Sequence, residues 1–188
     1  MVANRADHDR EYMTVEEYLE LDSNTEGVRY EYIDGYAYMM SGGTNNHARI
    51  CANLVRQLGN ALEGGPCEVF TSDARVQIAE YRRILHPDVT VSCQEEEITT
   101  MIRHPRVVVE VLSSSTKLFD LSKKLLMYQS CPSIEAIMFV DPDMFSINLF
   151  LKEEMLWINV FYQAGELVEI ECLGVSLPIE SIYRGVRF

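Results

Sequence analysis

The sequence predicts one α/β domain built on a mixed β-sheet, and three observations support this prediction. Segments 107–112 and 134–140 are short, apolar and rich in β-branched residues, which is typical of buried strands. Between them, segment 119–129 carries apolar residues at helical spacing: Leu121, Leu125, Leu126 and Tyr128. The order strand, helix, strand implies a parallel pair with a right-handed crossover. Segments 29–40 and 145–162 each contain two strand-like runs around a short turn, which favours antiparallel hairpins.

Length and composition indicate one folded domain. The 188 residues can bury a sizeable core, and the hydrophobic fraction of 47% is ordinary for a soluble protein. Residues 1–12 are polar and mixed in charge, so we expect a flexible leader before a single domain at 13–188. No apolar run approaches the length of a membrane span, so no membrane association is expected. The cysteines are scattered and odd in number, which favours reduced side chains in a cytoplasmic protein over a disulfide frame or a zinc site: Cys51, Cys67, Cys93, Cys131 and Cys172.

The first part of the domain predicts a helix, a hairpin and a second helix. Thr14 and Glu17 form a capping box that opens a short helix. Asp34 and Gly35 supply the turn of the hairpin, and the sequence leaves open whether the face that carries Glu31 is buried. A longer helix follows, ending at two glycines, with apolar residues at helical spacing: Ile50, Cys51, Leu54, Val55, Leu58 and Leu62.

The remaining elements are mostly short strands. Pro105 suits the start of its strand because proline lacks an N–H donor. The acidic run at 95–97 is expected to be a solvated loop or the start of a helix, and 113–116 a polar turn. Strands are expected at 67–72, 75–80, 88–91, 107–112, 134–140, 145–151, 156–162 and 167–172, with a closing helix from about 177.

The net charge of −13 and the pI near 4.7 disfavour general affinity for nucleic acid, which normally relies on a basic surface. The basic residues are unevenly distributed, however. Between Leu125 and Tyr183, Lys152 is the single basic residue. A largely acidic protein can therefore hold a locally basic site built from the earlier residues: Arg49, Arg56, Arg75, Arg82, Arg83, Arg103, Arg106, Lys117, Lys123 and Lys124.

Two carboxylates lie in or beside strands that do not need them for packing. Asp88 follows a proline at the mouth of one strand. Glu110 lies inside an apolar strand, where an unpaired charge would cost several kcal/mol. If these strands are neighbours, as consecutive strands often are, the carboxylates can converge. A hard cation such as Mg²⁺, or Mn²⁺ in its place, prefers oxygen ligands and can activate water for phosphodiester hydrolysis. We therefore predict a metal site made by Asp88, Glu110 and the backbone carbonyl of Val111, with a nearby lysine that orients the water.

The order of several motifs resembles that of a known family. Along the chain the sequence contains R-Y-E-Y-I-D-G, P-D-V, V-V-V-E-V-L-S-S-S-T, F-D-L-S-K-K-L-L-M-Y and I-M-F-V-D-P. This order, which extends from about Met13 to the final helix, resembles the Uma-two-type putative restriction endonucleases of the PD-(D/E)XK nuclease superfamily. The resemblance implies a restriction-endonuclease-like core, in which helices flank a central mixed β-sheet, and magnesium-dependent cleavage of DNA. We also expect a homodimer.

The resemblance assigns roles to individual residues. Asp88 and Glu110 match the acidic residues of the two motifs, and Glu31 matches an N-terminal glutamate of the family. The superfamily's lysine would lie two residues beyond Glu110, where this sequence has Leu112. In this family the lysine comes from the following helix, and the matching residue is Lys124.

Further side chains are expected around this site. Asp120 lies four residues before Lys124, so the two share a helix face, whereas Lys123 points elsewhere. The family usually has a proline in the serine turn, where Ser114 stands in this sequence. The residues expected to contact substrate or to support the metal ligands are His47, Asp120, Arg83 and Lys123.

Two other functions remain open at this point. Taken singly, Asp88, Glu110 and Lys124 have ordinary explanations as a turn aspartate, a solvent-facing strand residue and an exposed helix lysine. A non-catalytic binding or scaffold protein could keep the nuclease-like fold. A metal-free hydrolase could use two carboxylates as acid and base. A metal titration helps to separate these alternatives: for the nuclease, Mg²⁺ or Mn²⁺ should raise the melting temperature of the native chain, and Asp88→Ala should abolish the rise.

Overall fold

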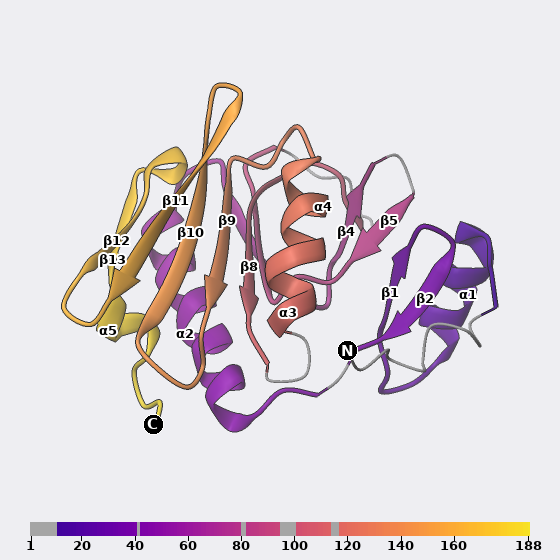
Figure 1. Ribbon diagram of the computed structural model, residues 1–188, viewed down its shortest axis with the longest axis horizontal. Coiled ribbons are helices and arrows are strands. Elements are labelled where there is room, and N and C mark those ends of the chain that lie inside the picture. The colour runs from indigo at the N-terminus through magenta and orange to yellow at the C-terminus, as the bar shows by residue number, and fades with distance from the viewer. Residues whose placement is uncertain (1–10, 41, 80–81, 95–100, 114–116) are drawn as a thin grey trace.

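A six-stranded mixed sheet forms the centre of the molecule (Figure 1). The computed structural model describes residues 11–40, 42–79, 82–94, 101–113 and 117–188. Strands β8 and β9 pair in parallel, and the other neighbours in this sheet are antiparallel, so the predicted mixed α/β fold is confirmed. The spatial order is β11 (Leu156–Gln163), β10 (Ser146–Glu153), β9 (Ala136–Val140), β8 (Pro105–Val111), β6 (Val89–Ser92) and β3 (Glu68–Thr71).

In a second, smaller sheet, the N-terminal hairpin pairs with strands from the middle of the sequence. Its order is β2 (Tyr36–Met39), β1 (Tyr30–Ile33), β5 (Arg83–Leu85), β4 (Arg75–Ile78) and β7 (Met101–Ile102). The predicted turn at Asp34 and Gly35 joins β1 to β2. Both residues adopt the positive φ that a tight two-residue hairpin turn requires. The predicted capping box opens α1 (Val15–Asn24), whose Tyr18 is buried against Tyr32.

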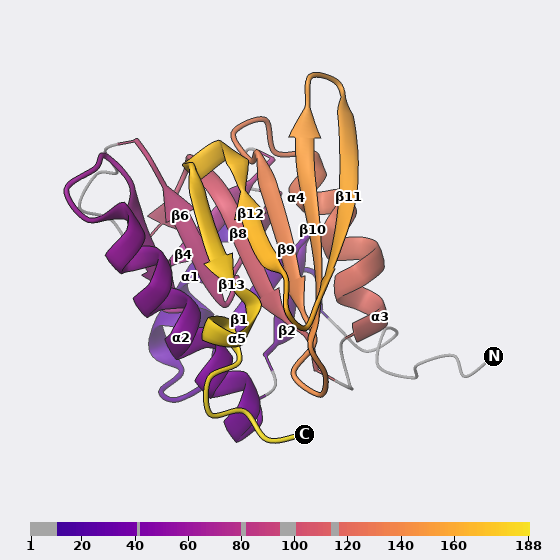
Figure 2. The same ribbon diagram turned by 90° about the vertical axis from the view of Figure 1, so that its left-hand side faces the viewer.

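Helices cover both faces of the central sheet, and the alternation along β8 assigns its side chains to one face or the other. On one face, Val107, Val109 and Val111 pack with α2 (Asn45–Leu62) and α5 (Ile179–Ile182). Val108 packs on the opposite face with Tyr128 and the helix that follows β8. Figure 2 shows α2 and this second helix on opposite sides of the sheet. The small hairpin of β12 (Leu167–Ile170) and β13 (Val175–Pro178), joined by the 3₁₀ turn η3 (Glu171–Leu173), also packs on the α2 side.

The helix predicted at 119–129 contains an unexpected π-helical turn. It consists of α3 (Lys117–Phe119), the π-helical η2 (Asp120–Lys124) and α4 (Leu125–Gln129). Such π turns are rare and frequently lie at functional sites. The predicted apolar face is correct for Tyr128 and wrong for Leu126, which is 68% exposed. The buried face carries Asp120 and Lys124 as well, so this helix presents charged side chains to the sheet.

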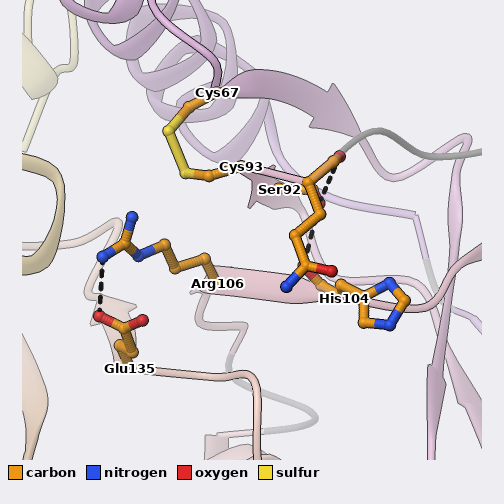
Figure 3. The surroundings of a disulfide bond; sticks show 7 residues. Cys67, Ser92, Cys93, His104, Arg106 and Glu135 are labelled. Carbon is orange, nitrogen blue, oxygen red and sulfur yellow. Dashed lines mark hydrogen bonds and ion pairs between the residues drawn. A yellow bond between two sulfur atoms is a disulfide. The ribbon is translucent and has the colours of Figure 1, made fainter.

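The prediction that all the cysteines are reduced is wrong, because Cys67 and Cys93 form a disulfide (Figure 3). The antiparallel register of β3 and β6 places Glu68 opposite Ser92, so the cysteines that flank this pair also lie opposite each other. Their Cα atoms are 3.8 Å apart. Cys51, Cys131 and Cys172 are free. The expected cytoplasmic location rested on free cysteines, so this disulfide removes part of its basis and the location stays a prediction.

Most other predicted elements are present, with boundaries shifted by a few residues. The second hairpin, β10 with β11, pairs over its full length, and the predicted strand at 167–172 ends earlier, at Ile170. Most of the leader, the acidic run at 95–97 and Ser114 lie outside the described residues. Among the described residues, no helix combines the length and apolarity that a membrane span requires.

Candidate active site

Glu110 is a buried carboxylate in the middle of the molecule. It alternates with Val109 and Val111 along β8, so it faces the π-containing helix. It is 5% exposed and accepts hydrogen bonds from the Lys124 ammonium, at 3.0 Å, and from the Tyr128 hydroxyl. Burial raises the pKa of Glu110, Lys124 opposes this effect, and the neighbouring carboxylates add to it. Two side chains of one helix therefore hold the same carboxylate oxygen, Oε1, of this glutamate.

Lys124 connects Glu110 to the N-terminal hairpin. Its Nζ lies 2.8 Å from Oε1 of Glu31 and 3.7 Å from Oδ1 of Asp120. Burial alone would lower the pKa of this ammonium, but the attraction of Glu110, Glu31 and Asp120 outweighs burial and raises it. Lys124 is therefore a charged, buried lysine. The alternative explanation, an exposed helix lysine, is wrong. The predicted shared face of Asp120 and Lys124 is confirmed.

The face of the N-terminal hairpin that carries Glu31 is buried, a point that the sequence left open. Glu31 is 6% exposed and lies on the buried face of β1. One carboxylate oxygen, Oε1, accepts from Lys124 and, at 3.3 Å, from the backbone N–H of His86. His86 stands just before Asp88 in the chain, so Glu31 is tied both to the lysine and to the segment that carries the aspartate.

Asp88 lies directly before β6, across from Glu110. Because Val89 pairs with Val109 in the antiparallel ladder, the preceding Asp88 is opposite the following Glu110. Asp88 Oδ2 accepts a hydrogen bond of 2.7 Å from the backbone N–H of Val111 and lies 3.2 Å from Nε2 of His47. The prediction that the two strands are neighbours is confirmed. The negative charge of Asp88 contributes to the raised pKa of Glu110.

His47 lies in the first turn of α2, with its ring against Gly43. Thr44 caps this helix by accepting from the His47 backbone N–H at 3.2 Å. A Cβ at position 43 would lie 2.7 Å from Cγ and Nδ1 of the ring, so glycine is needed for this approach. The hydrogen bond with Asp88 raises the pKa of His47, burial opposes it, and the Asp88 charge and the Val111 backbone add to the rise. His47 therefore lies beside Asp88, where it was expected to support the metal ligands.

The other predicted residues differ in their positions. Asp120 is buried beside Lys124. Lys123 is exposed and lies over the ring of Phe119, 5.7 Å from its centre. Arg83 donates to Asp34 at the hairpin turn, 3.2 Å away. Tyr128 was predicted only as an apolar helix residue, since the sequence gives no sign that its hydroxyl reaches Glu110.

The charge balance of this group of side chains suits a hard cation. Four carboxylates, those of Glu31, Asp88, Glu110 and Asp120, stand against the single ammonium of Lys124 and the imidazole of His47. Even with the histidine protonated, negative charge is in excess. Carboxylate and carbonyl oxygens are the donors that Mg²⁺ and Mn²⁺ prefer, so Asp88, Glu110 and the Val111 carbonyl form a fitting donor set.

Comparison with known proteins identifies relatives of this chain. The sequence matches the family model described as "Uma2: Putative restriction endonuclease" over residues 15–180. It is 35% identical over 179 residues to the uncharacterized protein slr1290 of Synechocystis sp., covering 94% of each chain. It is 29% identical over 164 residues to the uncharacterized protein sll1609 of the same organism, covering 85% of this chain and 92% of that relative.

A solved structure has the same fold. The crystal structure of a putative nuclease belonging to DUF820 from Anabaena variabilis superposes with a TM-score of 0.74, at 19% identity, over 91% of this chain and 97% of the other. At this identity the likeness establishes the fold alone. The family match, by contrast, spans the whole site from Glu31 to Lys124. The chain therefore belongs to the Uma2 family of putative restriction endonucleases.

Proposed function

We propose that this protein is a divalent-metal-dependent endonuclease that hydrolyses phosphodiester bonds in DNA. The family and the fold support the coarser statement, a restriction-endonuclease-like nuclease. The observation that carries the finer proposal is the position of Lys124, whose ammonium lies 2.8 Å from Glu31 and 3.0 Å from Glu110 in a buried, acid-rich site. A buried charged lysine beside hard-cation ligands suits the stabilisation of negative charge during phosphoryl chemistry.

In this proposal Asp88, Glu110 and the Val111 carbonyl hold Mg²⁺, or Mn²⁺ in its place. The ion supplies charge neutralisation and a more acidic bound water. Lys124 orients the attacking water and stabilises charge that develops on the phosphate. Glu31 and Asp120 keep the ammonium in place, because both carboxylates lie within 4 Å of it. His47 fixes Asp88 through its hydrogen bond to Oδ2.

DNA remains the proposed substrate despite the acidity of the chain. A net charge of −13 opposes phosphate binding at long range, so affinity should depend strongly on divalent ions, which neutralise part of this charge. This charge favours the second candidate, a non-catalytic scaffold that keeps the fold. The two candidates differ in whether DNA is cut.

A homodimer is also proposed rather than established. The edge strand β11 exposes Leu156, Ile158 and Phe161 to 71%, 40% and 48%. Apolar side chains on an edge strand are a common basis for association between copies of a chain. Light scattering after size-exclusion chromatography would give the mass directly, and a monomer at high concentration would contradict this proposal.

The experiment that tests the nuclease proposal is cleavage of supercoiled plasmid and of single-stranded DNA with Mg²⁺ or Mn²⁺. The native chain should nick DNA, and chelation should stop it. Glu110→Gln should be inactive, whereas Lys152→Ala should retain activity because the Lys152 ammonium donates to the Pro132 carbonyl and contacts no residue of the site. Cleavage by Glu110→Gln at the native rate would refute the assignment. Metal binding without cleavage of any nucleic acid would support the scaffold.

A further inference from the structure

A thiol lies next to the site and takes no part in the proposed hydrolysis. Cys51 is four residues after His47 on α2, so the two side chains share a helix face. The Sγ atom of Cys51 lies 3.5 Å from Nδ1 of His47, and Nε2 of the same ring lies 3.2 Å from Oδ2 of Asp88. One ligand atom from each of these three residues lies within 4.8 Å of the others.

The three side chains offer a different donor set from the one that suits Mg²⁺. A thiolate and an imidazole favour borderline metals of the Zn²⁺ class, whereas hard cations take oxygen ligands. At ordinary Zn–S, Zn–N and Zn–O lengths, tetrahedral ligand atoms are roughly 3.3–3.7 Å apart. The separations in this cluster, up to 4.8 Å, must shorten to that spacing, and the His47 ring must turn because Cys51 and Asp88 lie beside different ring nitrogens.

The surroundings keep these ligands in place and favour a cation. Gly43 and the Thr44 cap fix the first turn of α2, which carries His47. The negative charges of Asp88 and Glu110 lie close enough to act on Cys51, and they favour a cation at this point. Contacts of α2 with β6 and β8 hold this helix against the strands beside the site (Figure 2).

We infer that His47, Cys51 and Asp88 form a binding site for a zinc-class divalent ion, with the fourth position left to water. On binding, the Cys51 S–H bond breaks, its proton goes to solvent, and the sulfur bonds to the metal without any change of oxidation state. One imidazole nitrogen binds the ion, while the other remains available for a partner in the protein.

The two metal sites share Asp88, which has a functional consequence. An ion at His47, Cys51 and Asp88 withdraws a ligand from the hard-cation site next to it, so zinc-class ions should inhibit cleavage at concentrations well below those of Mg²⁺. This inhibition rests on the proposed nuclease function. The binding site itself does not, because it can be measured without DNA.

Cobalt(II) titration of the full-length protein tests the site, since a thiolate bound to Co²⁺ gives a charge-transfer band in the near ultraviolet that oxygen and nitrogen ligands do not give. The native chain should show this band and bind Zn²⁺ in calorimetry, with competition between the two ions. Cys51→Ser should abolish the band and weaken Zn²⁺ binding at least about tenfold. His47→Gln should weaken it similarly.

Cys172→Ser is the matched control, because Cys172 is also a free, half-buried cysteine with a raised pKa but lies outside the cluster. This variant should keep both the band and the affinity. A Co²⁺ spectrum without a thiolate band, or native Zn²⁺ affinity in a folded Cys51→Ser, would overturn the site. Zn²⁺ binding in a protein that cuts no DNA would leave the site standing and refute only the nuclease proposal.

Discussion

Asp88 Oδ2 accepts a hydrogen bond from the backbone N–H of Val111, with 2.7 Å between oxygen and nitrogen. This bond joins the two sequence motifs of the site. β6 begins at Val89, so the aspartate side chain provides an acceptor for a backbone donor at the end of β8. The position of Asp88 is therefore fixed by the sheet as well as by His47, and this rigidity suits a metal ligand.

Asp88→Asn should remove stabilisation by divalent ions. The amide oxygen can still accept from Val111, so the fold is expected to persist, but the charge that attracts the cation is lost. A saturating ligand at about 100 times its Kd stabilises the native state by about 2.7 kcal/mol. Differential scanning calorimetry with and without Mn²⁺ should show a rise in Tm for the native chain and none for Asp88→Asn. An equal rise in Tm for both proteins would show that Asp88 is not a ligand of the metal.

Lys124→Ala should separate metal binding from cleavage. Removing the ammonium increases the excess negative charge around Glu110 and Glu31, so Mn²⁺ should bind at least as tightly as in the native chain. DNA cleavage should fall by about 100-fold or more because a charge-stabilising group is lost. Breaking a buried ion pair typically costs about 3–5 kcal/mol, so stability must be checked by urea unfolding. Unimpaired cleavage by a folded Lys124→Ala would exclude the proposed role.

Tyr128→Phe should weaken the fold without altering its shape. The hydroxyl donates to the buried Glu110 carboxylate, and the ring is fully buried. Hydrogen bonds to charged groups contribute about 1.5–3 kcal/mol. Urea unfolding should show a loss in this range, which added Mn²⁺ partly restores if the ion binds Glu110. No change in the free energy of unfolding would mean that this hydrogen bond contributes little.

The buried ring of His86 should make stability depend on pH. Burial lowers the pKa of His86, although its bond to the Ser72 carbonyl and the charges of Asp22 and Glu31 act in the opposite direction. Above the unfolded pKa of about 6.5 the ring is neutral in both states, so its contribution is complete. Below it the unfolded chain takes up the proton more readily, and stability is lost as the pH falls through the folded pKa.

The measurement is the free energy of unfolding at about pH 7 and about pH 5. His86→Gln should show a smaller decrease than the native chain, because the titrating ring is gone. His104→Gln should behave as the native chain does, since His104 is exposed. If the decrease is the same in all three proteins, another group is responsible for it.

Reduction of the Cys67–Cys93 disulfide should destabilise the protein. The bond closes a loop with a sequence separation of 26. Chain entropy gives about 3.5 kcal/mol for such a loop. Urea unfolding of Cys93→Ser, compared with the native chain in oxidising buffer, should show a loss of this order, and added reductant should affect only the native chain. Native stability in the variant would contradict a structural role for the bond.

Local patterns predicted the elements well and the contacts between distant segments less well. The capping box at Thr14 and the turn at Asp34 depend on neighbours in sequence, and both were correct. Glu31 could not be assigned to a face, because what covers it comes from His86 and Lys124, far along the chain. The disulfide was missed because it depends on the register of β3 and β6.

The expected proximity of Asp88 and Glu110 followed from the two neighbouring strands, and the family resemblance added Glu31 and Lys124. Helical spacing placed Asp120 beside Lys124, and the π-helical turn preserves this proximity. The contribution of Tyr128 was missed because a tyrosine at an apolar helix position is equally well explained by packing. Cys51 was assigned to the apolar side of its helix for the same reason, and only the fold shows that it approaches His47 and, through that ring, Asp88.

The bond between Cys67 and Cys93 closes a covalent loop within the chain. If the two ends were pulled apart, tension would pass from one sulfur to the other and bypass the residues between them, shortening the fully extended length by roughly 90 Å. A machine that threads a polypeptide through a narrow pore for degradation or transport would meet two strands side by side at this point. Reduction of the disulfide to two thiols would then control passage through such a pore.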